Sequence, residues 1–140
     1  MSSRRDTIAV VGQVARDLVL CMADAPAPGG SATVLERREL LGGKGANQSV
    51  ALAQLGVPVT LVGVVGTDEV GDRLLAQART DGVDVTHVVR RAGATTGLVV
   101  DVVDRHGDWR YLEDLPADVS LTEADIAAAA PAAGGCSSRC

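Results

Sequence analysis

The sequence predicts an α/β fold with a doubly wound parallel sheet and a small β appendage built from separated segments. Short Val-rich runs alternate along the chain with Ala-rich runs, which is the pattern of strands alternating with helices. The Val-rich runs are continuously apolar, as in parallel strands that are buried on both faces. With 140 residues, the chain is long enough for one domain around one core.

Two buried strands and two helices form the expected body of the fold. Residues 7–12 and 59–66 are the apolar runs that predict the strands. The first helix, over residues 45–55, is expected to end at Gly56, which suits the left-handed position after a helix. The second helix follows a cap at Thr67 or Asp68 and ends near Gly82. Its predicted apolar face consists of Val70, Leu74, Leu75 and Ala78.

The appendage is predicted from two strand-like hairpins. One pairs residues 17–23 with residues 33–40 across the turn-rich segment "APAPGGS", and the other turns at "RHGD". A third helix is expected to start at Ser120, which forms a capping-box pattern with Glu123. We expect residues 127–140 to be a disordered tail. The tail holds two of the three cysteines, and two thiols alone do not make a metal site.

Composition excludes several classes of partner. The formal net charge of −5 argues against nucleic acid, which needs a basic face. The aromatic residues are Trp109 and Tyr111, too few to predict a platform for stacked bases. No apolar run approaches the roughly 20 residues that span a membrane. Three cysteines are few and odd in number, which predicts a reducing, cytoplasmic location.

The segment "LLGGKGANQSVALAQLG", residues 40–56, contains the candidate ligand-binding residues. It is not a Walker phosphate loop, because Gly45 follows Lys44 where Ser or Thr is needed. It is not a dinucleotide fingerprint, because the third glycine is missing and the first strand is distant. A glycine loop opening a helix, with Lys44 and Asn47, suits an oxygen-rich ligand such as a sugar. The alternative is a tight strand-to-helix turn with Lys44 in water.

The run "GGKGANQSVALAQLG…VTLVGVVGTDEVGDRLL" resembles the first signature of the PfkB-type carbohydrate kinases, and most of all that of ribokinases. The segments "VVGQVARDLV", "PAPGGS" and "TTGLVVDVVD" agree with this family in the same order. The resemblance implies a ribokinase-like Rossmann-type sheet with helices on both faces and a small β-sheet lid. Residues 1–126 would form its N-terminal half, incomplete at the C-terminal side, with lid segments at about 17–40 and 95–112.

The resemblance also implies an activity, the ATP-dependent transfer of phosphate to a ribose-type or related sugar hydroxyl, with Mg²⁺. The positions that match sugar-contacting residues of the family are Asp17, Gly43, Lys44 and Asn47. A carboxylate such as that of Asp17 can accept hydrogen bonds from two neighbouring hydroxyls. Residues 95–97 match the start of the lid's return strand, where we expect a structural role. The family also implies that the lid offers a surface for a homodimer.

Two departures from the family pattern qualify these expectations. Ala15 stands where ribokinases usually carry an Asn that touches the sugar, which puts ribose itself in question. The second signature, a Gly-Ala-Gly-Asp-like turn with the catalytic Asp, does not occur in the chain. We therefore expect no catalytic residue, no complete ATP site and no activity from the isolated chain; His87 and His106 are expected to be non-catalytic. The alternatives are a sugar-binding module, a lid-mediated dimerisation module or a truncated remnant.

Overall fold

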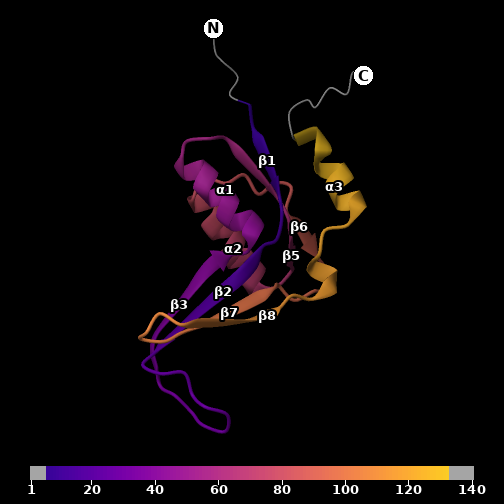
Figure 1. Ribbon diagram of the computed structural model, residues 1–140. Helices are drawn as coiled ribbons and strands as arrows, with labels where there is room; N and C mark the ends of the chain where they lie inside the picture. Colours follow the sequence, from indigo (N-terminus) through magenta and orange to yellow (C-terminus); the bar gives the residue numbers. More distant parts are fainter. Residues whose placement is uncertain (1–5, 133–140) are drawn as a thin grey trace.

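The computed structural model describes residues 6–132 and shows a parallel α/β body with a four-stranded lid beneath it (Figure 1). The body contains β1 (Ile8–Val11), α1 (Lys44–Gln54), β4 (Val59–Val62), β5 (Val64–Gly66), α2 (Glu69–Thr80), β6 (Val89–Arg91) and α3 (Glu123–Ala129). The lid contains β2 (Ala15–Met22), β3 (Val34–Gly42), β7 (Leu98–Val103) and β8 (Trp109–Asp114). Short 3₁₀ turns over Ala117–Val119 and Ala130–Ala132 flank α3. The predicted α/β class and appendage are thus confirmed.

The parallel strands of the body come in two pairs. β1 pairs with β4, and β5 pairs with β6. The single strand predicted over residues 59–66 is therefore wrong, because it is interrupted at Gly63. A Cβ atom at Gly63 would lie 2.7 Å from Val14 Cγ2, so only glycine allows this close approach. The Gly63 carbonyl accepts a hydrogen bond from the Val89 N–H at 2.8 Å, which starts the pairing with β6.

The core is aliphatic and lies between the strands and the two long helices. Figure 1 shows α1 and α2 on one side of β1 and α3 on the other. Asp68 caps α2 by accepting a hydrogen bond from the Gly71 N–H at 2.8 Å. The predicted α2 face is buried at three of its four positions, and Val70 is half-buried. The buried cluster includes Val10, Val14, Ala46, Val59, Leu61, Val65, Leu74, Leu75, Ala78, Val83, Val85 and Val88.

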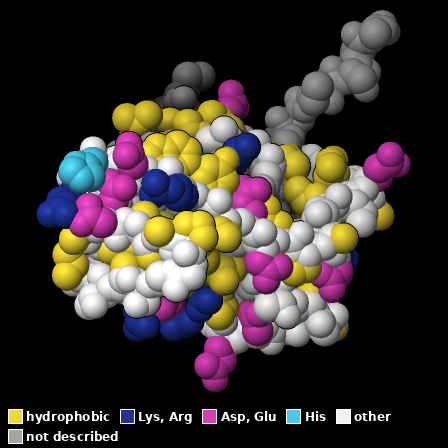
Figure 2. Space-filling model, turned by 60° about the horizontal axis from the view of Figure 1, so that its bottom comes forward, with side chains coloured by type: hydrophobic (Ala, Val, Ile, Leu, Met, Phe, Trp, Pro, Cys, Tyr) yellow, Lys and Arg dark blue, Asp and Glu magenta, His cyan; other side chains and the backbone are white. Residues whose placement is uncertain are grey.

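The lid is one sheet with the strand order β3-β2-β7-β8. The pairs β2–β3 and β7–β8 are antiparallel and correspond to the two predicted hairpins. Between the hairpins, β2 and β7 pair in parallel, with Asp17 opposite Val99. Figure 2 brings the lid end of the molecule forward and shows hydrophobic side chains at the surface among charged ones. Both outer strands carry exposed large side chains, such as Leu35 and Leu112.

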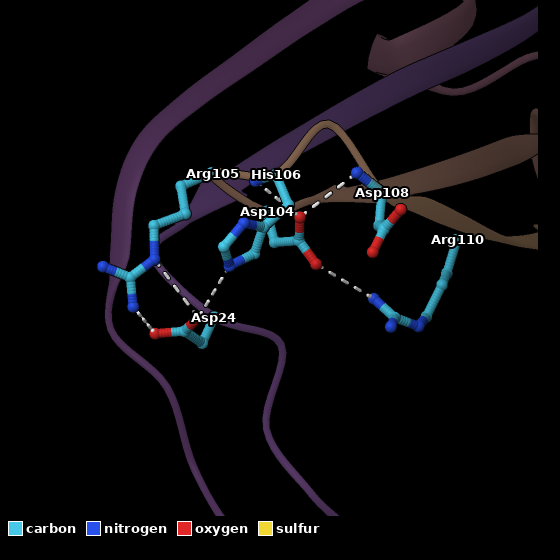
Figure 3. Close-up of polar contacts among 6 residues, drawn as sticks. All are labelled: Asp24, Asp104, Arg105, His106, Asp108 and Arg110. Carbon is cyan, nitrogen blue, oxygen red and sulfur yellow. Dashed lines mark hydrogen bonds and ion pairs between the residues drawn. The ribbon is translucent and has the colours of Figure 1, made fainter.

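Polar contacts join the two hairpins at the tip of the lid (Figure 3). The Asp104 carboxylate accepts hydrogen bonds from the backbone N–H groups of His106 and Asp108, at 2.9 and 3.1 Å, and so closes the β7–β8 turn. The guanidinium of Arg105 pairs with the Asp24 carboxylate just beyond the end of β2. Since this second contact crosses from one hairpin to the other, it holds the tip of the lid together.

The third helix starts later than the sequence pattern predicts. Its cap is Thr122 and not Ser120: the Thr122 hydroxyl accepts from the Asp125 N–H, and the Asp125 carboxylate accepts from the Thr122 N–H. Arg91 also pairs with Asp125 at 2.7 Å, which fixes this end of α3 to β6. The tail expected from residue 127 is wrong over residues 127–132, because α3 continues to Ala129 and a 3₁₀ turn over Ala130–Ala132 follows it. The remainder, residues 133–140, lies outside the described residues.

Candidate functional site

The carboxylate of Asp17 lies directly over Gly42, where the lid meets the body. A Cβ atom at Gly42 would collide with the Asp17 carboxyl group, so the absence of a side chain makes room for it. Below it, Ala15 is fully buried and lies opposite Gly42 across the β2–β3 pair. No group within residues 6–132 donates a hydrogen bond to the Asp17 carboxylate. Its oxygens are therefore available to accept hydrogen bonds from a ligand.

The segment after Gly42 turns sharply from β3 into α1. Gly43 has φ of +91°, and a Cβ atom there would lie 2.5 Å from the Gln13 carbonyl oxygen. That carbonyl accepts hydrogen bonds from the N–H groups of Gly45 and Ala46, at 3.0 and 3.2 Å. These two N–H groups are therefore not free to bind a ligand. The loop is thus a tight turn, and Lys44 is an exposed residue within it.

The structure brings three of the four predicted residues together and sets the fourth slightly apart. Gly43 and Lys44 directly follow Gly42, which itself lies beneath the Asp17 carboxylate, and Lys44 is exposed as the first residue of α1. Asn47 lies one turn further along and lines a groove of about 490 Å³ between α1 and α2. The same groove is lined by Arg16, which points to the opposite face of β2 from Asp17. Contact between Asn47 and the ligand of Asp17 stays a prediction.

A second carboxylate, Asp101, shares the lid face with Asp17. The register places Asp101 opposite Val19 on β2, two residues along from Asp17. Burial and the negative charge of Asp101 together raise the pKa of Asp17 above 3.8. Asp101 was not among the residues predicted from the sequence, although it is the one charged residue in the apolar run "LVVDVV". A charge inside an otherwise apolar strand was the signal that could have identified it.

A hydrogen-bonded hub fixes the start of β7 beneath the site. The Thr96 hydroxyl donates to Asp68 Oδ1 at 2.5 Å and accepts from the buried Gly66 N–H at 3.0 Å. The Thr96 N–H donates to Asp68 Oδ2 at 2.8 Å, so the α2 cap and the lid strand share one carboxylate. Burial raises the pKa of Asp68, but hydrogen bonds from Thr96 and Gly71 outweigh it and lower the pKa. This hub gives residues 95–97 the structural role expected of them.

A small hollow of about 210 Å³ opens at the carboxyl end of β1. It is lined by Gly12 and Gln13 and by the segment that follows β8, including Leu115 and Ser120. Ligands of open α/β sheets bind outside the carboxyl ends of their strands. The hollow, the Gly42 turn and Asp17 all lie at this end of the body, so this is the candidate binding site.

The described residues do not fit ATP with Mg²⁺. The N–H groups of Gly45 and Ala46, in the first turn of α1, are occupied by the Gln13 carbonyl and are not free for a phosphate. No group of three or more His, Cys, Asp or Glu side chains within residues 6–132 is placed to hold a metal ion. In the same part of the chain, no helix is long and apolar enough to cross a bilayer.

Comparison with known proteins agrees with this arrangement. The family model described as pfkB family carbohydrate kinase matches residues 5–133. A ribokinase of Schizosaccharomyces pombe is 35% identical over 113 residues, which cover 75% of this chain and 35% of that protein. A nucleoside kinase of Methanothermobacter thermautotrophicus is 30% identical over 129 residues, which cover 84% of this chain and 41% of that protein.

A solved structure extends the similarity to three dimensions. A ribokinase of Arabidopsis thaliana, complexed with ribose and ATP, aligns with a TM-score of 0.67 and 28% identity. The alignment covers 78% of this chain and 36% of that one. The chain spans about a third of the length of the curated relatives it matches: 31% of a Haemophilus influenzae ribokinase and 35% of the S. pombe protein.

Proposed function

Because the chain belongs to the pfkB family of carbohydrate kinases, we propose that it binds the sugar acceptor of an ATP-dependent phosphotransfer. The observation that carries this proposal is the position of Asp17. Its carboxylate lies over the Gly42 turn, without a hydrogen-bond donor among residues 6–132, at the carboxyl end of β1. In this proposal residues 1–126 are the N-terminal half of the domain, with lid segments at about 17–40 and 95–112.

The chemistry of the site suits neighbouring hydroxyl groups. An ionised Asp17 carboxylate accepts hydrogen bonds from two hydroxyls at once, and Lys44 donates to a sugar oxygen. In the overall reaction the γ-phosphoryl group of ATP is transferred to a sugar hydroxyl oxygen, which gives ADP, a sugar phosphate and a proton. ATP and Mg²⁺ come into this proposal through the family. Since the described residues do not fit them, we assign no step of the transfer to this chain.

The proposed acceptor is a ribose-type sugar or a larger molecule that contains one. The relatives are named as ribokinases and as a nucleoside kinase, which differ in what is attached to the ribose. Ala15 contributes only a buried methyl group at the floor of the site, so in this proposal the binding of the sugar depends on Asp17 and Lys44. We also place the protein in the cytoplasm, where a free thiol such as that of Cys21 stays reduced.

Calorimetric titration of the purified chain with ribose tests the proposal. We expect a saturable heat of binding, and no release of ADP when ATP is added together with the sugar. Fructose serves as a second acceptor, and sorbitol, an open-chain polyol, as the control. A titration without saturable heat for either sugar would show that the chain does not hold an acceptor.

A second candidate function is pairing of two chains through the lid. The observation in its favour is the exposure of large apolar side chains on the outer strands, for example 71% for Leu35 and 63% for Leu112. Sedimentation velocity tests this candidate: a dimer should form at micromolar concentration and dissociate in a Leu35→Glu variant. A monomer across the whole concentration range would rule it out.

A further inference from the structure

The lid face that carries Asp17 also carries the two aromatic residues of the chain. Alternate residues of a strand share a face, and directly opposed residues of paired strands do so too. From the register, Asp17 lies in a row with Val99 and Glu113, and the next row towards the tip contains Val19, Asp101 and Tyr111. Trp109 lies one row further, opposite Val103. The aromatic pair therefore starts one row beyond Asp17, on the same side of the sheet.

The two rings are stacked on each other and are open to solvent. Their centroids are 5.2 Å apart and their planes differ by 12°, while Trp109 and Tyr111 are 62% and 51% exposed. Composition predicts no stacking platform, because it cannot show that the only two large rings come together. Trp109 lies on the tip side of Tyr111, so it covers the tip-side face of the tyrosine ring. Along β8, Tyr111 is therefore the ring nearer to the row that contains Asp17.

We propose that this stack is a platform for the heterocyclic base of a nucleoside whose ribose is held by Asp17. The inference rests on the proposed acceptor site and names its substrate class. Strand spacing puts the Cα atoms of Asp17 and Tyr111 roughly 12 Å apart, two strands across and one row along. Such a span suits a sugar with an attached base, because a single pentose ring held by Asp17 does not extend to Tyr111.

The polar surroundings of the platform favour a base with amino groups. Asp101 on β7 is directly opposite Tyr111 on β8, and Glu113 lies two residues beyond Tyr111 along β8. Both carboxylates accept hydrogen bonds, so they match the exocyclic amine of adenine. Stacking of a base on an aromatic side chain typically strengthens binding by about tenfold or more. We therefore expect adenosine to bind at least tenfold more tightly than ribose.

The experiment uses the fact that Trp109 is the only tryptophan in the chain. Adenosine and ribose are titrated separately, with the dissociation constant measured by calorimetry and ring stacking followed by the emission of Trp109. Tyr111→Leu removes the ring nearer to Asp17, and Asp114→Asn, on the opposite face of β8, is the control. We expect adenosine to quench the emission of Trp109 and to bind more tightly than ribose. Tyr111→Leu should abolish this preference while the affinity for ribose is kept, and Asp114→Asn should have no effect.

Each contrary result has a distinct meaning. Equal affinities for adenosine and ribose, or a preference that survives Tyr111→Leu, would overturn the inference and leave the acceptor site in place. Binding of neither ligand would overturn the acceptor site itself. If Tyr111→Leu dissociates a dimer in sedimentation and leaves adenosine binding unchanged, the stack serves pairing of two chains and the inference is wrong. Circular dichroism melting confirms that each variant is folded.

Discussion

Replacing Thr96 by Val should destabilise the fold, because it dismantles the hub that joins the lid to the body. The Thr96 hydroxyl is the acceptor for the buried Gly66 N–H, at 3.0 Å, and the donor to the Asp68 carboxylate, at 2.5 Å. Valine has a similar shape but neither hydrogen-bonding group. The substitution therefore leaves a buried donor unpaired and removes one hydrogen bond to a charged group.

The two losses set the expected magnitude. An unpaired buried N–H costs about 1–3 kcal/mol, and a lost hydrogen bond to a charge costs about 1.5–3 kcal/mol. Asp68 keeps its hydrogen bonds from the N–H groups of Gly71 and Thr96, which places the second loss at the low end. The sum is about 2.5–4.5 kcal/mol, a large share of the roughly 5–15 kcal/mol that stabilises a typical domain.

Urea unfolding measures this loss, with Thr80→Val as the matched control. The Thr80 hydroxyl makes one exposed hydrogen bond to the Ala76 carbonyl within α2, so its loss should stay within about 0.5 kcal/mol. We expect a lower midpoint for Thr96→Val with an unchanged slope. Equal midpoints for the two variants would refute the reasoning, since the hub would then contribute no more than a surface hydroxyl.

Three further predictions concern the carboxylates. Sugar binding needs an ionised Asp17, so the affinity for ribose should fall as the pH drops through the raised pKa of Asp17. Asp101→Asn should move this loss of affinity to lower pH, because it removes the negative charge that helps to raise that pKa. A calorimetric pH series in which the two proteins lose affinity at the same pH would contradict this prediction. Gly42→Ala should weaken ribose binding several-fold, because the new methyl group forces the Asp17 carboxyl group from its rotamer, at a cost of about 0.5–1.5 kcal/mol. An unchanged affinity for ribose would count against the placement of the Asp17 carboxylate over Gly42. The lowered pKa of Asp68 stabilises the fold above pH 3.8, and this contribution is lost as the pH falls through the pKa of Asp68 in the folded state. In urea unfolding, the free energy of unfolding of Asp68→Asn should therefore fall less steeply with decreasing pH than that of the wild type. Equal slopes in acid would disprove this prediction.

Local sequence patterns predicted the elements of the fold well. The helix over residues 45–55 and the two lid hairpins occur within a few residues of their predicted places, because glycine turns and apolar periodicity act locally. The break at Gly63 was not predicted, since it follows from the approach of Val14, a contact made only in the folded chain. The cap of α3 was misplaced because Ser120 and Thr122 both fit a capping pattern, and Asp125 selects Thr122.

The candidate site was predictable in part, because the glycine loop that opens a helix indicated Lys44 and Asn47, and the resemblance to a family added Asp17. The charge of Asp101 within an apolar run marks it in the sequence, but its place beside Asp17 follows only from the parallel pairing of β2 and β7. That pairing joins segments some 80 residues apart, and strand patterns alone do not specify which strands become neighbours. The stacking of Trp109 on Tyr111 was missed for a related reason: two aromatic residues look sparse until a strand places them on one face.

The affinity of Asp17→Asn for ribose, compared with that of Asp114→Asn, tests the central claim most directly. Both substitutions remove one carboxylate from the lid sheet, but Asp114 lies opposite Leu98 on the other face. A bidentate contact between a carboxylate and a diol contributes about 1.5–3 kcal/mol, so Asp17→Asn should weaken ribose binding by roughly ten- to a hundredfold in calorimetry. Asp114→Asn should leave the dissociation constant unchanged. Equal losses, or none, would show that Asp17 does not hold the sugar.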